Sequence, residues 1–180
     1  VPFSVDYLTF LMLLSIGIVS LSSLLVSRYT ISFGEERFNF INLLIIASIG
    51  MCGIVMVKDL FSLYVFLEVT AVASFLLIAF DKGRKALEGA FKYIVLSSIA
   101  TIMMLLSIAL FILISGDTSF SSIAAALRAS APGVVPQLAI VIFLCGLFIK
   151  GGIVPFHGWL PDAYATAPAP AAVLLAGIIT

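Results

Sequence analysis

The sequence predicts an all-α polytopic membrane protein, and three observations support this fold class. First, 63% of the 180 residues are hydrophobic and 10% are charged, whereas soluble globular domains are about 45–50% apolar and about 25% charged. Second, the apolar residues form runs of roughly 20 residues, the length that a helix needs to cross a bilayer. Third, these runs lack the period-2 alternation of barrel strands, so only α-helices satisfy their backbone in hydrocarbon.

Five apolar runs are long enough to span the membrane, and a sixth begins near the C-terminal end of the sequence. Only Lys58 and Asp59 separate the second run from the third, which predicts a tight antiparallel hairpin. The sixth run offers about 15 Å of helix against a hydrocarbon core of about 30 Å. We therefore expect the chain to be a piece of a larger bundle. The runs comprise residues 7–26, 38–57, 60–80, 90–115, 134–154 and 171–180.

The connecting segments predict an orientation. We expect residues 81–92 to form a charged loop, with Glu88 and Lys92 spaced to pair on the opening turn of the next helix. Residues 116–136 predict a short helix at the membrane surface. The loops on the side of the membrane that includes residues 81–92 carry six basic residues, and the loops on the other side carry two. The side with six is therefore expected to be cytoplasmic. The two groups are Arg28, Arg37, Lys82, Arg84, Lys85 and Lys92 against Lys58 and Arg128.

Composition and missing motifs exclude several function classes. The formal net charge is zero, so nothing favours binding to nucleic acid. Cys52 and Cys145 lie inside apolar runs, where they indicate buried thiols rather than a disulfide framework. A metal site is not expected from the single histidine, His157. The sequence also lacks a phosphate-binding glycine loop, a Cys-x-x-Cys pair and a nucleophile elbow, so no redox cofactor is expected on this chain.

Two ionisable residues lie inside predicted spans, where a charge costs several kcal/mol unless it is paired or hydrated. They are Glu68 in the third span and Lys150 in the fifth. At about 1.5 Å of rise per residue, Glu68 lies about 12 Å and Lys150 about 20 Å below the outer surface, so an ion pair is feasible. Such a pair could serve only to fix helix packing. Because desolvating two charges makes it a poor stability device, we favour a functional role.

The sequence after Lys150 predicts a broken helix. Gly151 and Gly152 are followed by Pro155 and then by a further proline, so regular hydrogen bonding cannot continue between about 151 and 161. Non-helical backbone at membrane depth is found where it is buried in protein or lines a water-filled cavity, as in many transporters. His157 lies in this segment and can exchange protons near neutral pH. It is either a member of a proton relay or an ordinary core or interface residue.

Hydroxyl side chains recur every four residues on the fourth span. Tyr93, Ser97 and Thr101 share one face, and Ser98 lies beside them. Hydroxyls in membrane helices commonly bond to backbone carbonyls or across helices, so helix packing is the favoured interpretation. A water-lined path is the alternative. Tyr64, one turn before Glu68, permits the same two interpretations.

Two motifs carry a resemblance to a known family. Residues 59–80 read DLFSLYVFLEVTAVASFLLIAF, and residues 150–170 read KGGIVPFHGWLPDAYATAPAP. The chain resembles the antiporter-like proton-translocating membrane subunits shared by respiratory complex I, membrane-bound hydrogenases and Mrp sodium/proton antiporters. That family fold has two inverted five-helix repeats, each with one broken helix. The resemblance implies that the five spans form the first of these repeats.

The resemblance also implies roles for individual residues. Glu68 matches the family's mid-membrane glutamate, Lys150 matches the lysine of its broken helix, and His157 matches the histidine that follows the proline of the break. The family's next functional lysine lies on the following helix, beyond Thr180. One position departs from a common pattern, since many members carry a second histidine where this sequence has Tyr164, although several branches also use tyrosine there.

The function implied by the resemblance is proton translocation through Glu68, Lys150 and His157. The chain would be an ion-translocating subunit of a redox-driven complex in an energy-converting membrane, namely a prokaryotic cell membrane. Its partners would be other membrane subunits, redox subunits that carry the electrons, and the lipid bilayer. A cation/proton antiporter subunit without redox chemistry is the alternative, and a purely structural membrane subunit is a third hypothesis. The sequence does not separate the first two.

Overall fold

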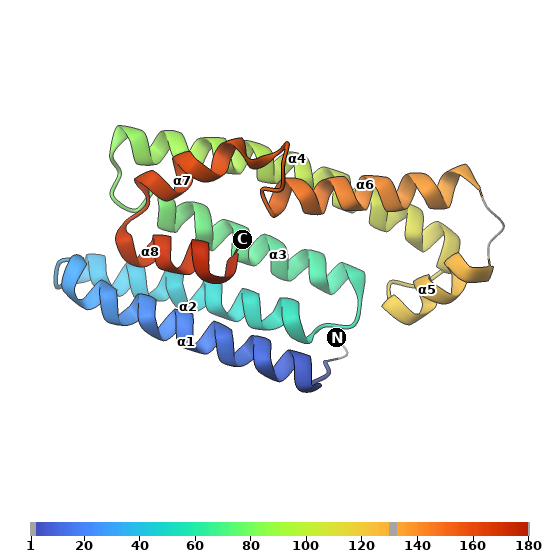
Figure 1. Ribbon diagram of the computed structural model, residues 1–180, viewed down its shortest axis with the longest axis horizontal. Coiled ribbons are helices and arrows are strands. Elements are labelled where there is room, and N and C mark those ends of the chain that lie inside the picture. Colours follow the sequence, from blue (N-terminus) through green and yellow to red (C-terminus); the bar gives the residue numbers. More distant parts are fainter. Residues whose placement is uncertain (1–2, 130–132, 180) are drawn as a thin grey trace.

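The computed structural model describes residues 3–129 and 133–179, and within these ranges every regular element is helical (Figure 1). In the described part of the chain, four helices are long and apolar enough to cross a membrane. This confirms the prediction of an all-α membrane protein. Residues 130–132 of the expected surface segment and Thr180 of the sixth run lie outside the described residues. The four helices are α1 (Tyr7–Thr30), α2 (Glu35–Met56), α3 (Leu60–Ile78) and α4 (Arg84–Ser115).

Shorter helices make up the rest of the described chain. The fifth apolar run forms α6, which has 17 residues and ends at Lys150. A 3₁₀ turn and a short helix follow the break, and the C-terminal part contains a further helix that passes into a π-helical turn. These elements are α5 (Phe120–Ala129), α6 (Val134–Lys150), η1 (His157–Trp159), α7 (Leu160–Thr166), α8 (Ala169–Leu174) and η2 (Leu175–Ile179).

Local sequence signals explain where several helices begin and end. Asp6 caps α1 by accepting a hydrogen bond from the Thr9 amide, and Asp59 caps α3 through the Ser62 amide, both at 2.8 Å. Each carboxylate satisfies an amide that has no partner inside the helix. Helix α4 ends at Ser115 and is followed by Gly116, whose φ of 72° lies in the left-handed region that glycine adopts readily. These caps place the helix ends close to the predicted loops.

The start of α4 differs from the prediction. The expected charged loop over residues 81–92 is wrong for most of its length, because α4 begins at Arg84. Its first turns are rich in Arg, Lys, Ala, Leu and Glu, which favour helix even when the side chains are solvated. Only residues 79–83 connect α3 to α4. The expected pair between Glu88 and Lys92 is present, with 2.9 Å between Oε1 and Nζ.

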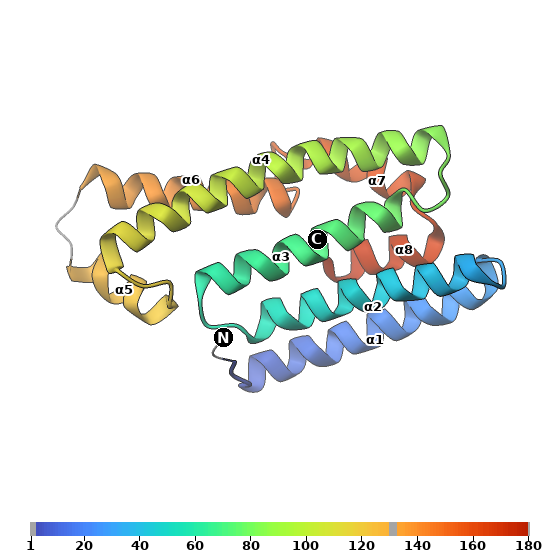
Figure 2. The same cartoon turned by 180° about the vertical axis from the view of Figure 1, so that it is seen from behind.

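The helices are arranged so that the connections rich in basic residues share one end of the molecule. Figures 1 and 2 show the α1–α2 and α3–α4 connections at that end, and α5 with the N-terminus at the other. At the α5 end, the Leu60 amide donates to the Thr118 carbonyl at 2.8 Å and the Phe120 amide to the Lys58 carbonyl at 3.1 Å. The basic residues therefore segregate as expected. Which end faces the cytoplasm stays a prediction.

Small residues allow two helix pairs to approach closely. A Cβ atom at Gly50 of α2 would meet the side chain of Thr70 on α3, and one at Gly53 would meet the Phe66 ring. On the other side of the molecule, a Cβ at Gly146 of α6 would lie 3.1 Å from the Ala100 carbonyl oxygen of α4. Small residues at such contacts bring backbones together in membrane bundles. These contacts fix α3 against α2 and α6 against α4.

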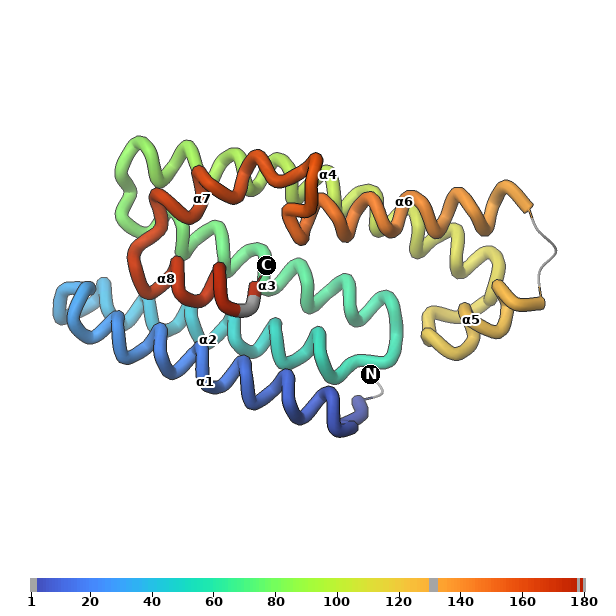
Figure 3. The backbone as a smooth tube through the Cα atoms, in the orientation of Figure 1, coloured from blue at the N-terminus to red at the C-terminus, as the bar shows by residue number. Residues whose placement is uncertain are grey.

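The segment after the break packs against both α4 and α1. Lys92 of α4 pairs with Asp162 of α7 at 2.6 Å. The Ser23 hydroxyl of α1 donates to the Pro170 carbonyl of α8 at 2.7 Å, and Leu174 is fully buried. Helix α6, the break and α7 run along α4, as the tube in Figure 3 shows. The core is thus formed by helices from both ends of the chain.

Candidate functional site

Glu68 and Lys150 form an ion pair between α3 and α6. Lys150 Nζ donates to Glu68 Oε1, although the two residues are 82 positions apart in the sequence. The Lys150 side chain is 10% exposed and that of Glu68 is 31% exposed. Each is the only charged residue of its helix, so the partner supplies stabilisation that water would otherwise provide. The pair that the sequence made feasible is formed.

Lys150 is the last residue of α6, at the point where regular helical hydrogen bonding stops. The backbone turns at Gly152, where φ is 59° and the side chain of Leu160 occupies the place of a Cβ atom. Glycine is required there because an L side chain would face both an unfavourable φ and a steric clash. The 3₁₀ turn begins at His157. The predicted break is confirmed, and it lies directly beside the buried ammonium group.

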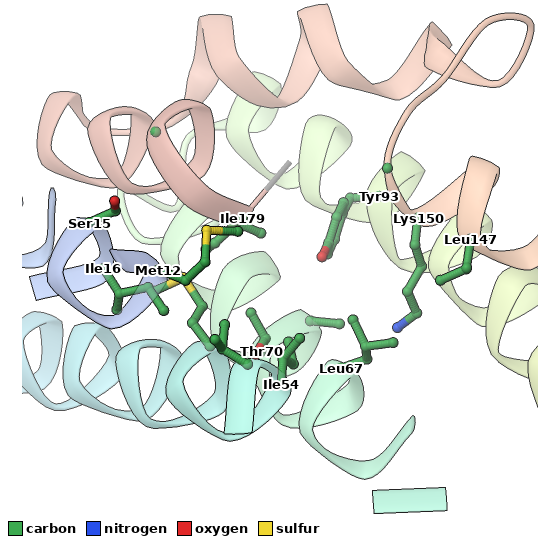
Figure 4. Close-up of a pocket in the computed structure, with 15 residues that line it drawn as sticks. Met12, Ser15, Ile16, Ile54, Leu67, Thr70, Tyr93, Leu147, Lys150 and Ile179 are labelled. Atoms are coloured by element: carbon green, nitrogen blue, oxygen red, sulfur yellow. The ribbon is translucent and has the colours of Figure 1, made fainter. Parts of the chain in front are cut away.

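A cavity of about 520 Å³ lies beside Lys150. In Figure 4 the Lys150 side chain extends from α6 toward Leu67 of α3, with the Tyr93 ring nearby. The lining is mainly apolar, with polar atoms from Lys150, Tyr93, Thr70 and Ser15. Volume on this scale exceeds what one water molecule requires, and polar groups are present to hold water. The cavity connects the ammonium group with helices α1 and α2.

A second, much smaller space lies on another side of Lys150. It is bordered by Tyr93, Ser97, Ile149 and Trp159 and has a volume of about 10 Å³, close to the smallest that holds a single water. Trp159 closes it by donating from Nε1 to the Ile149 carbonyl at 3.2 Å. The Tyr93 and Trp159 rings meet edge to face, with centroids 4.8 Å apart. These contacts fold the segment after the break back onto the end of α6.

Thr101 of α4 is a member of the site that the sequence did not single out as such. Its Oγ1 lies 2.7 Å from Glu68 Oε1 and 2.8 Å from the Ser97 carbonyl oxygen. In the sequence it appeared as part of the hydroxyl face of the fourth span, for which packing was the favoured interpretation. The four-residue spacing identified the face but could not show that it points toward Glu68.

His157 is not part of this cluster. It lies at the beginning of η1, and its side chain is exposed. Tyr64 is partly buried and packs against the cluster formed by Leu60, Ile108, Phe111, Ile123 and Ala139. Within residues 3–129 and 133–179, no three His, Cys, Asp or Glu side chains gather in a way that could hold a metal ion. The charged centre of the site is therefore Glu68 with Lys150.

A comparison with known protein families shows to which family the chain belongs. Residues 57–180 match the family described as NADH:quinone oxidoreductase/Mrp antiporter, TM. The chain belongs to this family. The matched segment contains both motifs noted in the sequence, and thus Glu68, Thr101 and Lys150.

Individual relatives come from more than one branch of the family. The chain is 36% identical over 146 residues to NADH-quinone oxidoreductase subunit N of Desulforudis audaxviator, covering 81% of this chain and 29% of that protein. It is 30% identical over 175 residues to a Na(+)/H(+) antiporter subunit of Alkalihalophilus pseudofirmus, covering 97% and 36%. A chain of the archaeal membrane-bound sulfane sulfur reductase has a TM-score of 0.86 at 27% identity, with 95% and 35% covered. The chain thus spans about a third of the length of these relatives.

Proposed function

We propose that this chain is part of a membrane subunit that translocates protons within a redox-driven complex whose partner subunits carry the electrons. The observation that carries the proposal is the ion pair between Glu68 and Lys150 at the end of a broken helix and beside a cavity. Buried ionisable residues in a membrane are costly, and broken helices commonly mark ion sites in transporters. Family membership adds to this argument.

The ion pair provides a means of changing the proton affinity of Lys150. While Glu68 is close, its negative charge favours the charged form of the lysine. If the two groups separate inside a medium of low polarity, the ammonium loses its partner and the lysine releases its proton more readily. A conformational or electrostatic change in a neighbouring subunit would drive this separation. In this mechanism Lys150 takes up a proton when paired and releases it when separated.

His157 is proposed to return protons to Lys150 from the cytoplasmic side. It begins the 3₁₀ turn on the far side of the break, where its exposed ring is accessible to water or to other parts of the protein. An imidazole side chain can both accept and donate a proton, which suits this role. Because His157 lies outside the cluster of Glu68 and Lys150, the transfer requires intervening water.

A cation/proton antiporter subunit without redox chemistry is the second candidate. The similarity to the Na(+)/H(+) antiporter subunit of Alkalihalophilus pseudofirmus along 97% of the chain favours it, whereas the higher identity to NADH-quinone oxidoreductase subunit N favours the redox-driven complex. Purifying the full-length protein with its native partners separates the two. Iron-sulfur or quinone-binding subunits in the complex would support the first function, and a complex made only of membrane subunits without redox centres would support the second.

Ion translocation by the intact complex in membrane vesicles tests the relay. Lys150→Ala and Glu68→Ala are each expected to abolish or strongly reduce translocation, with unchanged subunit content. Lys85→Ala is the control, because Lys85 is exposed near the start of α4. If the pair only fixes helix packing, both variants should instead fail to assemble. A fully assembled Lys150→Ala complex that translocates at the normal rate would rule out the relay.

A further inference from the structure

We propose that Thr101 is a positioning residue that holds the Glu68 carboxylate in place and in its ionised form when Lys150 moves away. This inference rests on the proposed translocation function. Thr101 Oγ1 lies 2.7 Å from Glu68 Oε1, the same oxygen that accepts the hydrogen bond from Lys150 Nζ. One carboxylate oxygen is thus shared by a cationic donor from α6 and a neutral donor from α4.

The Thr101 hydroxyl has one proton and two acceptors within reach. The second acceptor is the Ser97 carbonyl oxygen, at 2.8 Å. An ionised carboxylate is the stronger acceptor, so the proton is directed at Glu68 while Glu68 is charged. If Glu68 becomes protonated, rotation of the O–H bond redirects the proton to the Ser97 carbonyl, a bond that helical threonines commonly make. Thr101 therefore keeps a partner in both states without moving a heavy atom.

The two donors differ in how far they can move. Thr101 has a short β-branched side chain with few rotamers in a helix, whereas Lys150 carries its charge on a flexible stem of four carbons. The backbone beside Thr101 is fixed, because Ala100 is fully buried and its carbonyl oxygen faces Gly146 of α6. Lys150 can thus leave Glu68 by a change of rotamer while Thr101 stays. The hydroxyl then remains on the carboxylate and continues to stabilise its charge.

Removing this hydroxyl should be visible in the pH dependence of translocation. A hydrogen bond to the charged form of a carboxyl group favours that form. Without it, Glu68 becomes protonated at a higher pH, so activity on the acid side is lost earlier as the pH falls. The other titratable groups whose charge interacts with Glu68 are Lys150 of α6, Tyr93 of α4 and Tyr64 of α3. None of these three side chains is a carboxyl group, so Glu68 is the member of this set that is expected to set the acid side of the profile.

The test compares Thr101→Val with Thr101→Ser in the full-length protein within its native complex. Valine keeps the shape and removes the hydroxyl, and serine keeps the hydroxyl. For Thr101→Val we expect the acid-side midpoint of translocation to rise by about one pH unit, a ten-fold change in proton affinity. Thr101→Ser should have the same acid-side midpoint of translocation as the wild type. Thr30→Val is the matched control, because Thr30 donates to the Val26 carbonyl at 3.0 Å on an exposed part of α1.

The outcomes separate this inference from the proposed function. A purely structural role for Thr101 would lower the amount of assembled complex or its rate without moving the midpoint, and this result would overturn the inference. If Lys150→Ala and Glu68→Ala abolish translocation but Thr101→Val keeps the wild-type pH profile, only the role of Thr101 is wrong. If Lys150→Ala and Glu68→Ala translocate normally, the proposed function itself fails and the inference fails with it.

Discussion

Lys92 Nζ lies 2.6 Å from Asp162 Oδ2, which joins the first turns of α4 to the short helix that follows the break. The same ammonium group lies 2.9 Å from Glu88 Oε1. Only the contact with Glu88 follows from sequence spacing. The contact with Asp162 holds α7 against α4 on the side of the molecule where most basic residues gather.

We expect this pair to contribute little to global stability. Both side chains are almost half exposed, at 44% and 48%, and exposed ion pairs contribute about 0–1 kcal/mol. Lys92→Met and Asp162→Asn should each leave the unfolding temperature nearly unchanged, because exposed ion pairs are weak, and any effect should shrink at high salt. Thermal unfolding of the detergent-solubilised protein at two ionic strengths measures it. A large fall in the unfolding temperature would show that α7 depends on this contact.

The contact between α4 and α6 is expected to tolerate no larger side chain at Gly146. A Cβ there would lie 2.8 Å from Met104 Cγ and 3.1 Å from the Ala100 carbonyl oxygen. Gly146→Val should destabilise the protein by about 1–3 kcal/mol, the usual cost of overpacking, and should also reduce translocation because it displaces Lys150. Gly17→Val is the control, since nothing lies within 4 Å of a Cβ at Gly17. Equal unfolding temperatures for the two variants would contradict the prediction.

The orientation of the protein in the membrane can be tested by cysteine labelling. Gly83 lies between α3 and α4 at the basic end of the molecule, and Ser121 lies on α5 at the other end; both are exposed. We expect an impermeant thiol reagent applied to intact cells to label Ser121→Cys and not Gly83→Cys. Cys52 and Cys145 are first replaced so that they do not contribute. Labelling of Gly83→Cys from outside would reverse the orientation.

The turn before α5 should show a pH dependence that originates in Asp117. Hydrogen bonds from Ser119, Ser122 and the Thr118 amide hold the pKa of the Asp117 carboxyl below its ordinary value of 3.8. Because the folded pKa lies below the unfolded one, the stabilising effect is present above the unfolded value and is lost as the pH falls through the folded pKa. An NMR titration of Asp117 should therefore give a pKa below 3.8. Ser119→Ala should raise it, and an unchanged value in that variant would contradict this cause.

The sequence alone determined the class of the protein and the break after Lys150, but not where α4 begins. Long apolar runs have only one way to satisfy their backbone in a membrane, so their helical conformation follows from composition. The break after Lys150 follows from Gly151, Gly152 and Pro155 for an equally local reason, because these residues interrupt helical hydrogen bonding wherever they occur. Glu68 and Lys150 were also identifiable, since a charge within an apolar run stands out without knowledge of its neighbours.

Only the tertiary structure decided which side chains from different helices contact one another. The contact of Thr101 with Glu68 depends on the rotation of α4 about its axis, and the contact of Lys92 with Asp162 depends on where α7 lies after the break. Periodicity defines which residues share a face of one helix but not which helix that face opposes. The opposing helix is set by close approaches such as that of Gly146 to Ala100, which arise from packing among segments distant in the sequence.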